Sequence, residues 1–162
     1  MERGKKKILS TVEAARFAAA ARRSGKTVVT TNGCFDILHV GHLRSLRQAK
    51  AKGDVLIVGI NSDASVRALK GKGRPIVPAR ERAEMVAALE PVDAVVIFRE
   101  KDPRAWLGRL KPRVHAKGGD RTMGEIVERE IVEKNGGAVV LLPIRKGRST
   151  TNIIRKIRQG KE

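Results

Sequence analysis

The chain has 162 residues, 41% of them hydrophobic, and carries a formal net charge of +18 from 35 Lys and Arg against 17 Asp and Glu. This length fits a single domain, no apolar run approaches the ~20 residues of a membrane span, and the basic start lacks the apolar segment of a signal peptide, so we expect a cytoplasmic protein without a membrane partner. The single cysteine, Cys34, excludes an internal disulfide and a four-thiolate zinc site.

The predicted elements begin with an N-terminal unit, residues 1–25, made of a basic leader and an Ala-rich helix at 11–23. Ser10 and Glu13 have capping-box spacing, and Gly25 suits the end of this helix. The remaining residues, 26–162, alternate between short β-branched runs and helical patterns. Strands are expected at 27–32, 55–60, 94–98, 114–117 and 138–142. Helices are expected at 42–52, 64–69, 79–89, 103–110, 125–134 and 151–158.

The strands at 55–58 and 95–98 are apolar at consecutive positions, which indicates that both faces of the sheet are covered. Short strands that alternate with helices connect as parallel βαβ units. We therefore expect an α/β domain with a Rossmann-like, doubly wound, five-stranded parallel sheet flanked by helices. Such sheets bind ligands at the carboxyl ends of their strands, where the strand order reverses, and every candidate site residue follows a strand or opens a helix.

His39, Gly41 and His42 follow the first strand of this domain and stand at the start of a helix. Residues three apart lie on one face of a helix, and a helix start favours anions because its first backbone N–H groups are unpaired. Two imidazoles there can donate hydrogen bonds to a phosphate, while Gly41 lets that phosphate approach the backbone. One alternative makes His42 an ordinary helix-start residue and His39 an ordinary loop residue. The other is a metal site that adds Cys34 to the two histidines, which lacks a fourth ligand unless His115 joins it.

Ser149, Thr150 and Thr151 place hydroxyl groups at the start of the final predicted helix. Hydroxyls and unpaired backbone N–H groups make this a second anion site, so we expect these residues to bind phosphate. An ordinary helix N-cap is the alternative.

Lys70, Lys72 and Arg74 lie in a glycine-rich loop that can close over phosphates. We expect Lys70 to neutralise charge in a transition state and Arg74 to bind the phosphate of an acceptor. Arg82, on the next predicted helix, is expected to neutralise phosphate as well. Solvated surface charges are the alternative for these side chains.

Lys117, Gly118, Gly119 and Asp120 directly follow a strand and offer flexible backbone against a nucleobase or ribose, with Asp120 as a hydrogen-bond acceptor. A plain Gly-Gly turn is the alternative.

Three further polar residues, Asp36, Asn61 and Asp63, follow strand ends and can hydrogen-bond the hydroxyl groups of an acceptor. Helix capping, above all by Asp63, and Asx turns are the alternative roles for them.

The segment at 32–42 closely resembles the HxGH signature of the nucleotidyltransferase superfamily that includes the cytidylyltransferases. Further blocks are similar to the adenylyltransferases of ADP-heptose synthesis, namely 31–39, 61–65, 69–71 with 74–75, 88–90 with 92–93, 117–120 and 149–154. These blocks cover most of residues 27–157. That family joins D-glycero-β-D-manno-heptose 1-phosphate to AMP from ATP and releases pyrophosphate, on the way to the lipopolysaccharide inner core.

The resemblance implies in-line attack by the sugar 1-phosphate on the α-phosphorus of ATP, without a covalent intermediate or a general base, and with Mg²⁺ held mainly by the nucleotide phosphates. The catalytic residues that it implies are His39, His42 and Lys70. The nucleotide contacts that it implies are Asn32, Gly33, Cys34, Phe35, Gly41, Arg82, Lys117, Gly118, Gly119, Asp120, Ser149, Thr150 and Thr151. The acceptor contacts that we expect are Asp36, Asn61, Asp63 and Arg74. Cys34 replaces the Thr common elsewhere in the superfamily and is expected to make a packing or backbone contact.

Superfamily relatives are often dimers, so we expect a homodimer. The chain begins at its own Met1 without a kinase portion, so it resembles the free-standing form of the family, which depends on a separate heptose kinase. Within the same chemistry, the alternatives are a cytidylyltransferase, or an adenylyltransferase for glycerol 3-phosphate or another sugar phosphate. The alternative of a different class is a nucleic-acid-binding protein on a nucleotide-binding fold, which the +18 charge favours and the 2% aromatic content disfavours.

Overall fold

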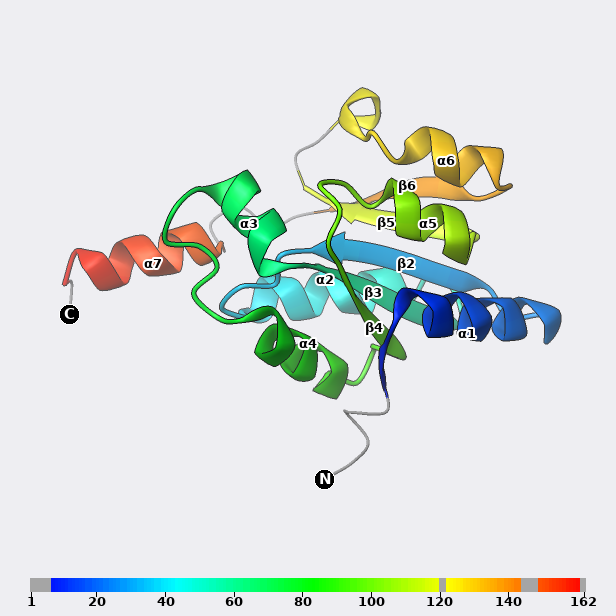
Figure 1. Cartoon of the computed structure of the whole chain (residues 1–162), viewed down its shortest axis with the longest axis horizontal. Coiled ribbons are helices and arrows are strands. Elements are labelled where there is room, and N and C mark those ends of the chain that lie inside the picture. The colour runs from blue at the N-terminus through cyan, green and yellow to red at the C-terminus, as the bar shows by residue number, and fades with distance from the viewer. Residues whose placement is uncertain (1–6, 120–121, 144–148, 161–162) are drawn as a thin grey trace.

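The computed structural model describes residues 7–119, 122–143 and 149–160. Its centre is a sheet of six parallel strands in the order β1-β4-β3-β2-β5-β6 (Figure 1). The strands are β1 (Ile8–Leu9), β2 (Val28–Gly33), β3 (Val55–Asn61), β4 (Ala94–Phe98), β5 (Val114–Gly118) and β6 (Ala138–Leu142). The strand order reverses at β2, because β3 pairs with one edge of it and β5 with the other. The carboxyl ends of β2 and β5 therefore flank the crevice in which such sheets bind ligands.

The predicted α/β class is confirmed, but the sheet has six strands instead of five. The additional strand, β1, lies in the basic leader and pairs with the outer edge of β4. Its two residues are too few to show any periodicity. The strands at 94–98 and 138–142 have the predicted bounds. Strands β3 and β5 are one residue longer at their carboxyl ends, and β2 is shifted by one residue at both ends.

Helices cover both faces of the sheet and its carboxyl end. They are α1 (Thr11–Arg23), α2 (Val40–Lys50), α3 (Asp63–Lys70), α4 (Ala79–Ala88), α5 (Arg104–Leu110), α6 (Arg129–Lys134) and α7 (Thr150–Arg158). Helices α1, α5 and α6 share one apolar cluster with the sheet, and α2 and α4 share the other. Helices α3 and α7 lie beyond the carboxyl ends of the strands (Figure 1). Among the described helices, none is long and apolar enough to cross a bilayer.

Two helix predictions show how local chemistry set the boundaries. The capping box of Ser10 and Glu13 begins α1 as expected, with Glu13 N donating to Ser10 Oγ at 3.2 Å. The helix predicted at 125–134 is instead two pieces, the 3₁₀ helix η2 (Met123–Glu125) and then α6. The turn between them contains Glu128, whose side chain is buried.

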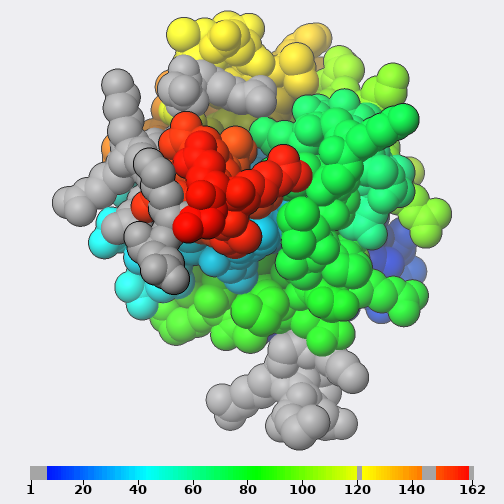
Figure 2. Space-filling model, turned by 90° about the vertical axis from the view of Figure 1, so that its left-hand side faces the viewer, coloured from blue at the N-terminus to red at the C-terminus, as the bar shows by residue number. Residues whose placement is uncertain are grey.

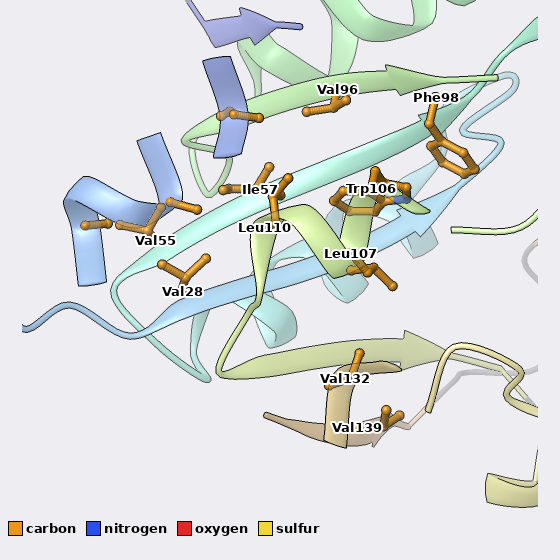
Figure 3. Packing of buried hydrophobic residues seen from close by; sticks show 14 of the residues in the cluster. Val28, Val55, Ile57, Val96, Phe98, Trp106, Leu107, Leu110, Val132 and Val139 are labelled. Carbon is orange, nitrogen blue, oxygen red and sulfur yellow. The ribbon is translucent and has the colours of Figure 1, made fainter. Parts of the chain in front are cut away.

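The core on the α5 side of the sheet is built from branched strand residues and one aromatic ring. Trp106, Leu107 and Leu110 of α5 pack over the sheet beside Val28 and Ile57 (Figure 3). Trp106 is 1% exposed although it is the largest side chain of the protein. Helix α5 thus covers this face of β2 and β3, at whose carboxyl ends the polar residues of the next section lie.

Candidate active site

A cleft of about 910 Å³ opens at the carboxyl ends of β2, β3 and β5, between the starts of α2 and α7. Figure 2 looks onto this end of the molecule, with α7 in red beside the green surface of α3 and the loop that follows it. Most residues that the sequence singled out line the cleft, namely Asn32, Gly33, Cys34, Phe35, Asp36, His39, Gly41, His42, Asn61, Lys70, Arg74, Lys117, Gly118, Ser149, Thr150 and Thr151. Segments from both halves of the chain therefore meet in one place. Asp63, Arg82 and Gly119 do not line it, and Asp120 is outside the described residues.

The two histidines are held together at the first turn of α2. His39 is the N-cap residue, and its Nδ1 accepts a hydrogen bond from Gly41 N at 3.1 Å. His42 Nδ1 in turn accepts from His39 N at 3.3 Å, and the two rings stack with centroids 3.9 Å apart. Because both Nδ1 atoms accept from backbone N–H groups, the proton of each neutral ring is on Nε2. The helix start thus fixes both rings in the tautomer whose Nε2 is a donor.

Burial keeps His42 uncharged at neutral pH. Removal of the ring from water, and next the proximity of His39, lower the pKa of His42 from 6.5 to about 4. The ring can therefore donate a hydrogen bond from Nε2 without carrying a net charge.

The loop between β2 and α2 has a strained backbone. Phe35 and Ile37 have φ angles of 51° and 49°, in the left-handed region that residues other than glycine seldom adopt. For a β-branched residue such as Ile37 this conformation is costly and persists only where surrounding contacts impose it. Phe35 packs beside His42, with ring centroids 5.4 Å apart.

Asp36, between these two residues, supplies the contacts that hold the loop. Its buried carboxylate accepts from Ile76 N and Val77 N, both at 2.9 Å, and from Arg74 Nε at 2.7 Å. Its carbonyl oxygen accepts from Thr150 Oγ1 at 2.6 Å. Burial alone would raise the pKa of Asp36, but these donors outweigh it and hold the pKa below its ordinary value. The carboxylate expected to bind a sugar hydroxyl is thus occupied by the protein's own donors.

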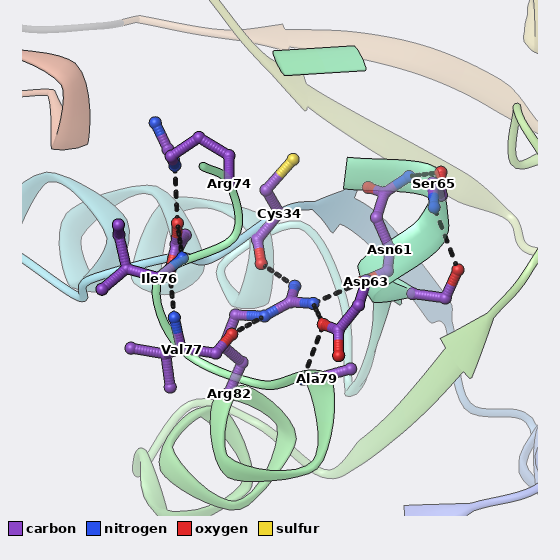
Figure 4. Close-up of polar contacts among 11 residues, drawn as sticks. Cys34, Asn61, Asp63, Ser65, Arg74, Ile76, Val77, Ala79 and Arg82 are labelled. Atoms are coloured by element: carbon purple, nitrogen blue, oxygen red, sulfur yellow. Dashed lines mark hydrogen bonds and ion pairs between the residues drawn. The ribbon is translucent and has the colours of Figure 1, made fainter. Parts of the chain in front are cut away.

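Arg82 is also committed to the protein instead of facing the cleft. Its guanidinium is 1% exposed and donates to the carbonyl oxygens of Cys34, Asn61 and Val77 (Figure 4). NH2 also contacts Asp63 Oδ1 at 2.8 Å. We expected Arg82 to contact phosphate, but its guanidinium instead links Cys34, which follows β2, to Asn61 at the end of β3.

Asp63 has a capping role, though for a different helix from the one considered. Its Oδ1 accepts from Ala79 N, the first residue of α4, at 2.9 Å. The N-cap of α3 is instead Ser62, whose side chain accepts from Ser65 N. Asn61 is 4% exposed and donates from Nδ2 to Ser65 Oγ at 3.0 Å. The acceptor contacts expected of Asp63 and Asn61 therefore compete with bonds that they already make.

The start of α7 combines a side-chain cap with hydroxyl groups that line the cleft. Ser149 is the N-cap, and its Oγ accepts from Asn152 N at 3.1 Å. Thr150 donates its hydroxyl to Asp36, whereas Thr151 is exposed and lines the cleft. The capping alternative therefore holds for Ser149, and phosphate binding at this helix start stays a prediction.

Three of the basic residues that the sequence singled out line the cleft, each from a different segment. Lys70 comes from the end of α3, Arg74 from the loop after it, and Lys117 from the end of β5. The Lys117 ammonium donates to Asn32 Oδ1 at 3.1 Å and to Glu128 Oε1.

Burial raises the pKa of Cys34, which therefore stays a thiol and acts through its backbone carbonyl. The described residues hold no group of three His, Cys, Asp or Glu placed to bind a metal ion.

The sequence interpretation missed part of the cleft wall. Arg44, Ser45 and Gln48 line it from α2. They follow Gly41 by three, four and seven residues, and this spacing predicts that they share one face of the helix with it. Lys101, Asp102 and Pro103 line it from the loop after β4, and Glu128 from the turn before α6. No motif marked these last residues, because they reach the cleft only through the tertiary fold.

Comparisons with known proteins agree with this geometry. The model of the cytidylyltransferase-like family matches residues 30–156. The Bifunctional protein HldE of Geobacter sulfurreducens is 52% identical over 143 residues, 88% of this chain and 29% of the relative. That of Geotalea uraniireducens is 52% identical over 146 residues, 90% of this chain and 30% of the relative. The chain thus spans about 30% of the length of the curated relatives it matches.

Solved structures show the same architecture. A lipopolysaccharide core biosynthesis protein from Thermoplasma volcanium has a TM-score of 0.63 and 29% identity, covering 76% of this chain and 100% of that one. A pantoate-beta-alanine ligase from Francisella tularensis shares the fold with a TM-score of 0.63 at 15% identity, covering 89% of this chain and 68% of that one.

A parallel sheet that brings a His-x-Gly-His helix start and a hydroxyl-rich helix start to one cleft defines a nucleotidyltransferase. The chain belongs to the cytidylyltransferase-like family.

Proposed function

We propose that the protein transfers AMP from ATP to D-glycero-β-D-manno-heptose 1-phosphate, giving ADP-heptose and pyrophosphate for the lipopolysaccharide core. The observation that carries this proposal is the stacked pair His39 and His42, held in one tautomer beside the start of α7. The motif blocks that resemble ADP-heptose adenylyltransferases support the substrate, as do the relatives at 52% identity.

The chemistry follows from the positions of the donors. The Nε2–H groups of His39 and His42 hydrogen-bond the α-phosphate as its charge redistributes during in-line attack. Lys70 neutralises charge on the phosphates, and the N–H groups at the start of α7 hold the triphosphate. The attacking phosphate oxygen is already anionic, so no general base is required. Catalysis then rests on positioning and charge compensation.

Magnesium would enter with the nucleotide. The cleft carboxylates Asp36, Asp102 and Glu128 each have a cationic side chain as partner, so the described residues fit a metal that the phosphates of ATP hold. Bound there, the ion would neutralise the pyrophosphate that leaves.

The acceptor would bind on the Arg74 side of the cleft. Asp36 holds Nε of Arg74, which fixes the plane of the guanidinium and leaves its terminal nitrogens outside this ion pair. A guanidinium fixed in this way suits the phosphate of a sugar 1-phosphate. We propose a homodimer as the working assembly and a sugar kinase activity as the source of this acceptor.

A matrix of nucleotides and acceptors tests the function. ATP, CTP and GTP are each combined with the heptose 1-phosphate, glycerol 3-phosphate and glucose 1-phosphate, and pyrophosphate release is measured. We expect release only with ATP and the heptose 1-phosphate. Preference for CTP or for glycerol 3-phosphate would refute the proposed substrates and leave a different nucleotidyltransferase.

A further inference from the structure

A chain of polar contacts leads from the core of the sheet to the mouth of the cleft. Thr30 Oγ1 lies 2.8 Å from His115 Nδ1, and His115 Nε2 lies 3.4 Å from Glu128 Oε1. The same Oε1 accepts from Lys117 Nζ, which also donates to Asn32 Oδ1. The contacts join β2, β5 and the turn before α6, which are far apart in the sequence but adjacent at this end of the sheet.

Glu128 carries a full charge inside the protein. It is 1% exposed, and His115 and Lys117 outweigh the effect of burial and lower its pKa to about 2. His115 is fully buried, which lowers its own pKa, so its ring is neutral at pH 7. The positive partner of the carboxylate is therefore Lys117. Loss of either member would leave a buried or half-buried charge unpaired.

This pairing distinguishes Lys117 from the other lysines of the cleft. Lys70 and Lys101 are exposed, and in the described part of the chain neither makes an ion pair. The side chain of Lys117 is 12% exposed and its charge is cancelled by Glu128. A cancelled ammonium attracts phosphate weakly, yet it still offers a fixed N–H donor. Such a donor suits the uncharged nucleoside part of a nucleotide.

We propose that Glu128 is a positioning residue for nucleotide binding, which holds the Lys117 ammonium so that one of its N–H groups meets the nucleoside of ATP. An ammonium has three donors, of which Asn32 and Glu128 take two. Without the carboxylate the four-carbon stem of Lys117 regains its rotamers, and nucleotide binding must order it again. This inference rests on the proposed function and divides the cleft into a nucleoside end at Lys117 and a phosphate end at the two histidines.

Binding measurements with Glu128→Gln test this role without turnover. Calorimetry compares ATP with inorganic tripolyphosphate, which has the phosphates but no nucleoside. We expect Glu128→Gln to weaken ATP binding about tenfold and to leave tripolyphosphate binding unchanged or slightly tighter. Glu133→Gln is the matched control, because Glu133 is an exposed acid of α6 and the change in charge is identical. It should bind both ligands like the wild type.

A double-variant cycle shows whether Glu128 acts through Lys117. Lys117→Met should weaken ATP binding to a similar extent, and the double variant should bind no more weakly than Lys117→Met alone. Thermal unfolding of each variant shows that it is folded. If Glu128→Gln does not fold, Lys117→Met carries the test, because selective loss of ATP over tripolyphosphate supports the proposal.

Three results would overturn the positioning role: ATP binding by Glu128→Gln that equals or exceeds the wild type, equal loss of ATP and tripolyphosphate, and additive effects in the cycle. If Glu128→Gln does not fold, unchanged ATP binding by Lys117→Met overturns it as well. A wild type that binds no ATP would instead refute the proposed function, and the positioning role with it.

Discussion

Replacing Arg82 by lysine tests whether this arginine serves the fold or the phosphates, because lysine keeps the charge but loses the planar fork of donors. The three guanidinium nitrogens of Arg82 donate to three carbonyl oxygens and to Asp63. One ammonium nitrogen can replace the bonds at Asn61 and Asp63, which leaves the carbonyls of Cys34 and Val77 without this donor. At about 1–3 kcal/mol for each unsatisfied buried acceptor, the loss is about 2–6 kcal/mol.

For a chain of this size each kcal/mol shifts Tm by about 2–4 °C, so the middle of that range predicts a decrease of about 8–16 °C. The assay is thermal unfolding followed by circular dichroism, together with kcat for pyrophosphate release well below Tm. Arg80→Lys is the control, since Arg80 is exposed on the same helix. An unchanged Tm with a large fall in kcat would refute this reasoning and give Arg82 the phosphate contact that the sequence suggested.

Three further predictions concern the histidine pair and the core. His42→Ala should lower kcat by about 10²–10³, as loss of a donor to a developing charge does, and near-normal turnover would exclude its role. Val40→Ala is the control, because Val40 is an exposed side chain of the same turn and its loss should leave pyrophosphate release unchanged. The ring of His42 binds a proton near pH 4 in the folded protein and near pH 6.5 in the unfolded chain. Lowering the pH from 7 to 4 should therefore reduce the free energy of unfolding of the wild type by about 3 kcal/mol more than that of His42→Asn. Denaturant unfolding measures this difference, and equal losses in the two proteins would contradict a buried neutral ring. Gly59→Ala should lower the free energy of unfolding by about 1–3 kcal/mol, because its Cβ would lie 2.5 Å from Trp106 Cζ2. Gly124→Ala is the control, since its Cβ would meet no atom within 4 Å. Equal Tm values for the two variants would show that α5 can shift away from Gly59 without loss of stability.

The sequence was sufficient for the class of fold because buried parallel strands are apolar at every position. Val55 to Ile60 and Ala94 to Phe98 show such runs, and each lies within one residue of its predicted bounds. The leader strand β1 could not be predicted, since two residues show no pattern and its edge pairing depends on β4. The break between η2 and α6 was missed because the apolar spacing of 125–134 also fits a continuous helix.

The candidate site was predictable only where neighbours in sequence act together. The HxGH turn and the hydroxyl cluster at the start of α7 are local patterns, and the structure brings both to the cleft. The roles of Arg82 and Glu128 depend on partners that the fold supplies, such as the Cys34 carbonyl and the Lys117 ammonium. A single sequence does not say which charged side chains already have such partners.

Asp36 lies between two residues in the left-handed conformation, Phe35 and Ile37, and it contacts both walls of the cleft. Its carboxylate accepts hydrogen bonds from Ile76 N and Val77 N in the loop before α4, and its carbonyl oxygen accepts one from Thr150 Oγ1 at the start of α7. Neither wall can be displaced alone unless one of these bonds breaks. Asp36 therefore couples the two walls mechanically, so a ligand that displaces one wall would also load the bonds to the other.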